Sequence, residues 1–179
     1  MATIAIIGDG PGGLSASLFL GRGGHDVQVY GRDETAMHYA HLRNYLGIAE
    51  VHGTDFQEDA RAQVQAVGVT LNDATVTEVA AGDDGFTVST ATGSTTADYL
   101  ILSEGQKSPL AASLGLATND DGVQVDRNGR SSMDRVYVVG RSARPRRSHA
   151  IISAGDGAAA AVDILSTIER KNVQDWDSG

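Results

Sequence analysis

Six residues near the N-terminus carry the clearest chemical signal in the sequence. Residues 8–13 read Gly-Asp-Gly-Pro-Gly-Gly, which fits the pattern G-x-G-x-x-G between a strand-like run and a helix-like run. In this pattern Gly8 permits a tight turn, Gly10 lets a pyrophosphate approach the backbone, and Gly13 lets the helix pack closely on the strand. The helix N-terminus offers free N–H groups and a positive dipole end to phosphates. The motif predicts dinucleotide binding; a glycine turn that binds nothing is the alternative.

A cluster of arginines is the second chemical signal. The cluster stands late in an otherwise acidic chain and comprises Arg141, Arg144, Arg146 and Arg147. Such a cluster can recruit a phosphate or a negatively charged partner. Alternatively, all of them except Arg141 belong to a solvated loop that balances nearby aspartates.

Histidines and the missing cysteines limit the catalytic chemistry. The 179 residues contain no cysteine, which excludes disulfides, zinc-thiolate sites and a dithiol relay within them. His38 and His41 flank Tyr39 without a neighbouring carboxylate pair, so we expect them to line a loop and expect no metal site. No Ser-His-Asp order or pair of carboxylates indicates hydrolysis.

The apolar pattern predicts the elements that hold the glycine motif. Residues 3–7 and 26–30 read as strands and residues 12–20 as the helix between them, which together form a βαβ unit. We expect further helices at 55–67, capped by Thr54 or Asp55, and at 151–168. Further strands are expected at 69–71, 75–80, 86–90, 94–102 and 135–139. The predicted fold class is α/β, a three-layer Rossmann-like domain whose central parallel sheet has a helix layer and a small antiparallel β-meander.

Length and charge limit the classes of partner. A chain of this size, with 41% hydrophobic residues, is expected to form one domain with halves 1–107 and 108–170 and a loosely ordered tail at 171–179. The formal charge of -9 argues against nucleic acid, because a phosphate backbone would be repelled. No early apolar run reaches membrane length, so we expect no membrane partner and a cytoplasmic location.

Four segments resemble FAD-dependent pyridine nucleotide-disulfide oxidoreductases of the thioredoxin-reductase-like branch. Residues 4–30 (IAIIGDGPGGLSASLFLGRGGHDVQVY) resemble the family's opening segment, and residues 44–47 (NYLG) its Asn-aromatic-Pro-Gly element beside the flavin. Residues 99–105 sit where a strand runs into an Ala-Thr-Gly turn. Residues 136–164 resemble the closing segment, in which a strand ends in Gly-Asp and a helix N-terminus faces the flavin pyrimidine ring. The resemblance spans residues 1–168.

The resemblance implies FAD as the cofactor and assigns residues to its binding. His149 stands where the family places glutamine or a similar residue beside the flavin. It either donates to the flavin O2 region or moves protons, which makes it the one catalytic candidate, or it is a structural histidine. The implied cofactor-binding residues are Gly8, Gly10, Pro11, Gly12, Gly13, Arg32, Asp33, Asn44, Val76, Ser103, Glu104, Gly105, Gly140, Arg141, His149 and Ala150.

One departure from the family lies at the end of the second strand. Gly31 replaces the acid that usually binds the ribose hydroxyls there. Arg32 or Asp33 would have to serve instead.

Two further departures lie in the loops after later strands. Ala-Thr-Gly has become Ser103-Glu104-Gly105, and Gly-Asp has become Gly140-Arg141. An arginine cannot accept the hydrogen bond of the ribityl chain, though it can donate to a pyrophosphate. We expect Glu104 and Arg141 to form an ion pair. The changes record either a rebuilt or a decayed flavin site.

An omission limits the expected activity. The family inserts an NAD(P)H domain with the redox dithiol between the halves of its FAD domain, whereas here Gly105 leads directly through residues 106–116 to the second half. We expect an FAD-binding oxidoreductase that needs an external donor, such as a separate reductase, an electron-transfer protein or a diffusing reduced nicotinamide, and that is not itself a thioredoxin reductase. A homodimer is one way to cover the exposed flavin face. A non-catalytic module that holds FAD, NAD or ADP is the alternative.

Overall fold

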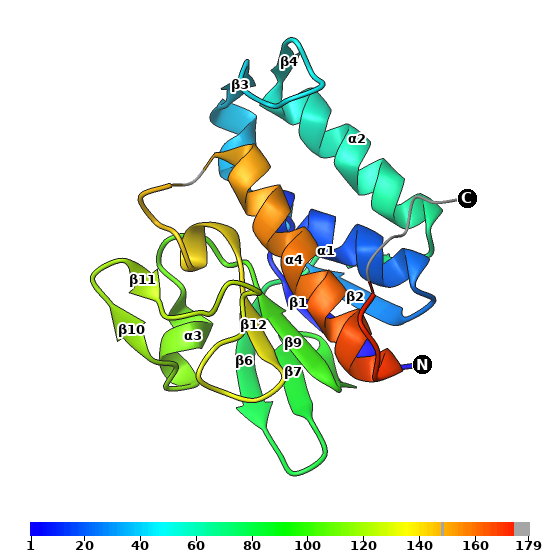
Figure 1. Ribbon diagram of the computed structural model, residues 1–179. Coiled ribbons are helices and arrows are strands. Elements are labelled where there is room, and N and C mark those ends of the chain that lie inside the picture. Colours follow the sequence, from blue (N-terminus) through cyan, green and yellow to red (C-terminus); the bar gives the residue numbers. More distant parts are fainter. Residues whose placement is uncertain (148, 174–179) are drawn as a thin grey trace.

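A five-stranded parallel sheet forms the centre of the molecule in the computed structural model, which describes residues 1–147 and 149–173 (Figure 1). The strand order is β12-β9-β1-β2-β5, and every neighbouring pair is parallel. The strands are β1 (Thr3–Ile7), β2 (Asp26–Tyr30), β5 (Thr70–Asn72), β9 (Tyr99–Leu102) and β12 (Val136–Val138). Because β1 is the central strand, the glycine turn that follows it has a neighbouring strand end on each side.

The two faces of the sheet support two separate hydrophobic cores. Successive side chains of a strand point to opposite faces. Ile4 and Ile6 accordingly pack with the helices, whereas Ala5 and Ile7 pack with the meander. Both faces are therefore covered, as is usual for a parallel sheet.

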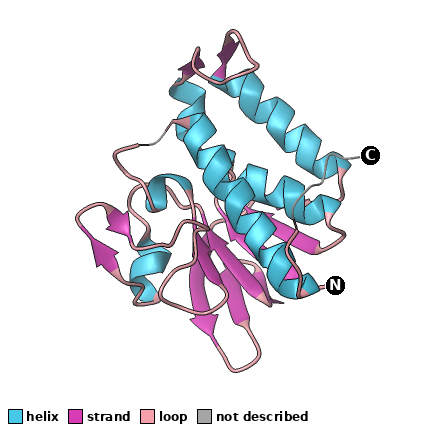
Figure 2. Ribbon diagram, in the orientation of Figure 1, coloured by secondary structure: helices cyan, strands magenta, loops and turns pink. Residues whose placement is uncertain are grey.

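Three helices cover one face (Figure 2). They are α1 (Pro11–Arg22), α2 (Gly53–Ala66) and α4 (Ala150–Glu169). α4 has the length and mean hydropathy of a membrane-spanning helix, but it packs along α1 and buries Ile164 and Leu165 completely, as a core helix does. Glycine permits this close packing, because a Cβ on Gly157 would clash with the carbonyl oxygen of Gly12.

An antiparallel meander covers the other face, in the strand order β6-β7-β8. Its strands are β6 (Val76–Ala81), β7 (Phe86–Thr90) and β8 (Gly93–Ala97). Smaller elements complete the described chain: the 3-10 turns η1 (Ala36–Tyr39) and η2 (Gly140–Ser142), the short helix α3 (Pro109–Ser113), and the hairpins β3–β4 (His41–Leu42, Val51–His52) and β10–β11 (Thr118–Asn119, Gly122–Val123).

The predicted fold class is confirmed, with corrections to single elements. The strand expected at 94–102 is two strands, because Asp98 turns the chain from the meander into the sheet and hydrogen-bonds Thr3 through its backbone N–H and its carboxylate, both at 2.8 Å. Neither Thr54 nor Asp55 caps α2: its N-cap is His52, and the Thr54 hydroxyl instead pairs with His38 Nδ1 at 3.1 Å. Of the expected tail, residues 174–179 lie outside the described residues.

Candidate functional site

The carboxyl ends of three neighbouring strands bring the glycine turn and both altered loops together. In the sheet register Ile7 pairs with Leu102, which pairs with Val138. The predicted residues Gly8, Ser103 and Gly140 therefore follow at one edge. Gly8 has a φ of +106°, which favours glycine, and a Cβ on it would clash with the backbone of Ser103. Both the backbone conformation and the close approach of Ser103 therefore require glycine at this position.

Helix α1 begins at this edge of the sheet. Gly10 is its N-cap, no side chain caps it, and Pro11 occupies the first helical position. A Cβ built on Gly10 meets no described atom within 4 Å, whereas one on Gly13 would clash with the Gly8 carbonyl. The turn thus packs tightly on its inner side and is open beside Gly10. Open space next to uncapped N–H groups fits a pyrophosphate.

A buried ionic cluster that sequence reasoning missed lies beside the turn. Asp9 is 4% exposed, and its carboxylate forms an ion pair with Arg61 of α2. Asp9 Oδ2 also accepts the backbone N–H of Asp33 at 3.0 Å, and Gln57 Nε2 donates to the Asp9 carbonyl at 2.6 Å. Gln57 and Arg61 stand four residues apart and so share one face of α2. The sequence shows this spacing and the acid inside the glycine turn, but no local pattern pairs residues that lie 52 positions apart.

The side chains of the two residues after Gly31 contact charged neighbours outside the glycine turn. Arg32 is half-exposed and lies 3.6 Å from Glu34 and 4.0 Å from Asp73. The Asp33 side chain lies 3.1 Å from His38 Nε2. The assignment of either residue to ribose binding stays a prediction.

At the N-terminus of α4, two predicted site residues that lie 105 positions apart in the sequence come into contact. Asn44 Nδ2 lies 3.1 Å from His149 Nδ1. His149 is the N-cap of α4 and Ala150 its first residue. Among the described residues, no side chain caps the N-terminus of either α1 or α4. Val76, by contrast, begins β6 and packs in the core beneath the sheet.

The expected ion pair between Glu104 and Arg141 is wrong. The Glu104 carboxylate accepts the backbone N–H groups of Leu110 at 2.9 Å and Ala111 at 3.2 Å, at the start of α3. Arg141 instead donates through Nη2 to Gln106 at 3.3 Å, and its buried Nε has no partner among the described residues. Burial raises the pKa of the Glu104 carboxyl, and the two backbone bonds offset part of that effect.

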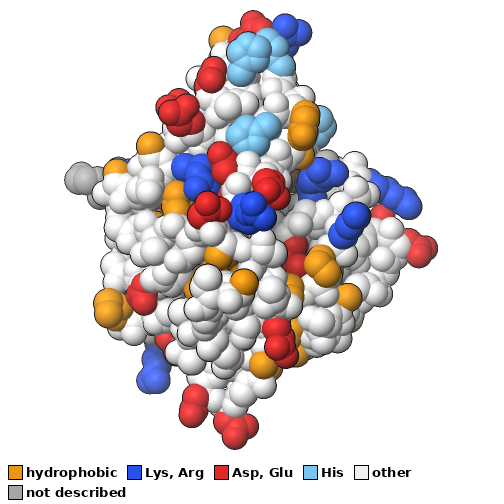
Figure 3. Space-filling view, turned by 180° about the vertical axis from the view of Figure 1, so that it is seen from behind, with side chains coloured by type: hydrophobic (Ala, Val, Ile, Leu, Met, Phe, Trp, Pro, Cys, Tyr) orange, Lys and Arg blue, Asp and Glu red, His pale blue; other side chains and the backbone are white. Residues whose placement is uncertain are grey.

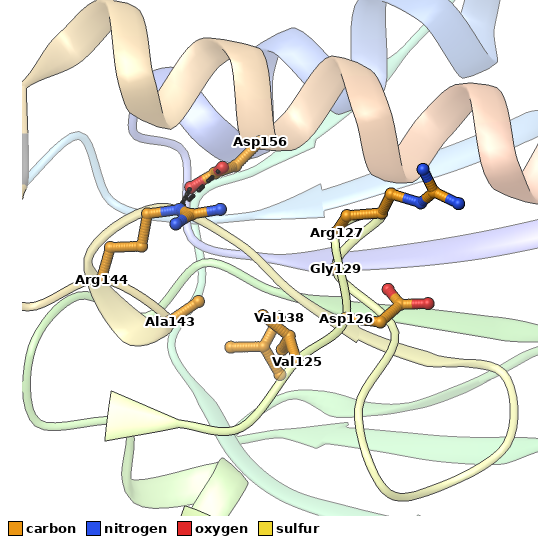
Figure 4. A pocket seen from close by; sticks show the side chains of 8 residues that line it. All are labelled: Val125, Asp126, Arg127, Gly129, Val138, Ala143, Arg144 and Asp156. Atoms are coloured by element: carbon orange, nitrogen blue, oxygen red, sulfur yellow. Dashed lines mark hydrogen bonds and ion pairs between the residues drawn. The ribbon is translucent and has the colours of Figure 1, made fainter. Parts of the chain in front are cut away.

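Two of the three remaining arginines of the cluster, Arg144 and Arg146, have aspartate partners. Arg144 Nε contacts both carboxylate oxygens of Asp156 on α4 at 3.0 Å, beside a small pocket lined by Val125 and Val138 (Figure 4). Arg146 lies 4.0 Å from Asp121. These contacts agree with the interpretation of a loop that balances nearby aspartates.

Histidines gather with charged side chains at the hairpin end of the molecule (Figure 3). His41 stacks on His52 with ring centroids 4.5 Å apart, and its Nε2 lies 2.7 Å from Glu50. Among residues 1–147 and 149–173, no group of three His, Asp or Glu side chains could hold a metal ion.

The family model for pyridine nucleotide-disulphide oxidoreductases matches residues 41–157. A comparison with curated proteins finds no match. Among solved structures, the chain is similar to the atypical thioredoxin reductase TRi from Desulfovibrio vulgaris Hildenborough (18% identity, 97% of this chain and 100% of that chain, TM-score 0.86).

Two further solved structures share the fold. One is a thioredoxin reductase from Gloeobacter violaceus (17% identity, 98% of each chain, TM-score 0.86). The other is a ferredoxin-flavin thioredoxin reductase from Clostridium acetobutylicum (18% identity, 94% of this chain and 98% of that chain, TM-score 0.78). At these identities the likeness concerns the fold alone. Because the family model covers well over half of the sequence, the chain belongs to the pyridine nucleotide-disulphide oxidoreductase family, whose members bind FAD.

Proposed function

We propose that the chain is an FAD-binding oxidoreductase domain that receives electrons from a separate donor. The observation that carries this proposal is that the open glycine turn at the N-terminus of α1 and the N-terminus of α4 lie at one edge of the sheet, and no side chain of the described residues caps either helix. Bound there, FAD supplies the electron-accepting ring. The chain's own residues hold its pyrophosphate at Gly10 and its flavin end near Asn44 and His149.

The dependence on a separate donor is supported by what lies between the two halves. From the end of β9 to the start of β12 the chain forms only α3 and the β10–β11 hairpin, and the 179 residues contain no cysteine. The family's own route from NADPH through a dithiol therefore has no counterpart in this chain. The name of the Clostridium relative couples a flavin protein to ferredoxin, which makes a small electron-transfer protein a reasonable class of donor.

The first test is the absorption spectrum of the purified protein, followed by identification of the ligand released on denaturation. A flavin spectrum with FAD released is expected, and a protein that neither carries nor takes up FAD contradicts the proposal. The second test is NADPH-dependent disulfide reduction with added thioredoxin. We expect no turnover by the pure protein, and reduction of the bound flavin by reduced ferredoxin.

A non-catalytic nucleotide-binding module is the second candidate. Arg141 favours it, because a guanidinium stands where the family has the carboxylate that holds the ribityl chain. Tight binding of ADP without retention of FAD would support the module.

Cytoplasmic location and a homodimer are also proposed. Tyr39 and Leu46 are almost fully exposed, and a second copy that covers them would remove apolar surface from water. Sedimentation of the purified protein measures the assembly; a monomer at micromolar concentration contradicts the dimer.

A further inference from the structure

Gly31 stands where the resembled family has an acid, and its backbone conformation does not require glycine. It directly follows β2 and is absent from the residues with a positive φ. A Cβ built on Gly31 would nevertheless lie 2.5 Å from Asp9 Oδ1 and closer still to Asp9 Cγ. Glycine is therefore needed at this position because the Asp9 carboxylate occupies the space where a side chain of residue 31 would begin.

The Asp9 carboxylate is held firmly in that space. Its Oδ2 takes both the Asp33 N–H and the Arg61 guanidinium, and the Asp9 carbonyl takes the fully buried amide of Gln57. The positive charge of Arg61 keeps the carboxylate from adding net negative charge beside a phosphate site. Oδ1, in contrast, accepts no hydrogen bond from the described residues.

The place of this carboxylate matches a part of the ligand. Gly8 N–H donates to the Tyr30 carbonyl at 2.8 Å, so the glycine turn and the end of β2 are joined. A dinucleotide whose pyrophosphate lies over the glycine turn places its adenosine ribose at the end of the second strand. A carboxylate at this point can accept hydrogen bonds from both ribose hydroxyls.

We propose that Asp9 supplies the carboxylate that reads the adenosine ribose, in place of a side chain at residue 31. The acid has moved from the end of β2 into the glycine turn, while its position in space is kept. Arg61 and the Asp33 N–H act as positioning groups through Asp9. This inference rests on the proposed FAD site. Arg32 cannot accept from a hydroxyl, and the Asp33 carboxylate lies beside His38.

The first experiment needs no substitution. Calorimetric titration of the purified protein, freed of ligand, compares ADP with 2′-deoxy-ADP and 3′-deoxy-ADP. We expect at least one deoxy analogue to bind about 10- to 100-fold more weakly, the size expected for a hydrogen bond to a charged group. Equal affinities for all three ligands would overturn the role of Asp9 and leave the FAD site standing. A protein that binds neither ADP nor FAD would overturn both the role of Asp9 and the proposed FAD site.

An alternative ligand chemistry is tested in the same titration. Arg61 and Arg32 both stand near residue 31, and arginine in that region suits a 2′-phosphate. Adenosine 2′,5′-bisphosphate is the probe. Tighter binding of this probe than of ADP would overturn a carboxylate that reads hydroxyls.

The second experiment exchanges the two positions. Asp9→Ser is expected to lose the discrimination between ADP and its deoxy analogues. Gly31→Glu alone is expected to destabilise the turn, because its Cβ falls on the Asp9 carboxylate. The double variant Asp9→Ser/Gly31→Glu removes the clash and supplies an acid from β2, so it should recover the discrimination within a few fold of the unchanged protein.

Thermal melts of all three variants show which of them fold. Loss of discrimination in a folded Asp9→Ser, with recovery in the double variant, supports the relocated acid. Undiminished discrimination in folded Asp9→Ser overturns it. If that variant does not fold, the titration of the unchanged protein with deoxy analogues decides alone.

Discussion

The N-terminus of α3 is closed by its own chain, whereas those of α1 and α4 are open. The Glu104 carboxylate takes two first-turn N–H groups of α3, which is only five residues long. No side chain of the described residues caps α1 or α4, and α1 begins at a glycine with empty space beside it. A helix normally satisfies its first N–H groups with side chains, water or ligands. The difference separates a helix start used for stability from two that are available to a ligand.

The largest expected effect on FAD affinity comes from filling the open space beside Gly10. Gly10→Val should fold normally, because Gly10 has a φ of -75° and free space at its Cβ. Its side chain would fill the pyrophosphate position, so FAD affinity should fall by at least about 3 kcal/mol, or roughly a hundredfold. Flavin fluorescence titration and a thermal melt measure the two properties.

A matched control lies three residues away. Gly13→Val should fail to fold or melt far lower, because its Cβ would clash with the Gly8 carbonyl. Retained FAD affinity in Gly10→Val would show that the ligand does not approach this turn.

Arg141 lies between the open and the closed region and tests whether the flavin end is rebuilt. Its Nη2 bonds Gln106 in the loop before α3, and its buried Nε has no described partner. If that guanidinium donates to the bound dinucleotide, Arg141→Ala should weaken FAD binding by about 1.5 to 3 kcal/mol. Titration of FAD and of ADP separates loss at the flavin end from loss at the pyrophosphate.

The opposite result has a defined signature. In a decayed site, Arg141→Asp would bind FAD more tightly than the unchanged protein, because it returns an acceptor to the ribityl chain. That outcome would count against the rebuilt site and in favour of the non-catalytic module.

Removing the Glu104 cap of α3 should lower the stability of the fold and leave FAD affinity nearly unchanged. Glu104→Ala removes both capping bonds of α3 and should lower the free energy of unfolding by about 0.5 to 2 kcal/mol, with FAD affinity nearly unchanged. Urea denaturation measures the loss. A larger effect on FAD than on stability would place Glu104 in the flavin site.

The pH dependence of Glu104→Gln follows from the direction of the pKa shift. Burial raises the pKa of the Glu104 carboxyl in the folded protein above its ordinary 4.5. An acid with a raised pKa loses its contribution to stability as pH rises from the unfolded value through the folded one. The advantage of the unchanged protein over Glu104→Gln should therefore shrink as pH rises above about 4.5. A constant difference between pH 4 and pH 7 would contradict this shift.

The sequence predicted the fold and the open turn because both depend on local patterns. Apolar runs and the glycine spacing identify β1, α1 and β2. The resemblance assigned Asn44 and His149 to one predicted flavin site, and the structure brings their side chains within hydrogen-bonding distance. The cap on α3 could not be predicted, because the five-residue helix has no periodic pattern and its acid lies six positions upstream of Leu110. The Asp9–Arg61 pair links residues 52 positions apart, and no local rule connects an acid in a glycine turn to a surface helix.

The smallest expected effect concerns the contact between Asn44 and His149 at the open end of α4. The two side chains come from distant segments and lie at a geometry that lets the amide donate to Nδ1, which leaves the proton on Nε2. Each of Asn44→Ala and His149→Ala should weaken FAD binding by about 0.5 to 1.5 kcal/mol, and the double variant should lose less than the sum, because one hydrogen bond accounts for part of both losses. ADP affinity is the internal control and should stay constant, since this contact lies at the flavin end. Strictly additive losses would mean that the two residues act on the flavin separately, and unchanged FAD affinity in both would show that the open N-terminus of α4 takes no part in the site.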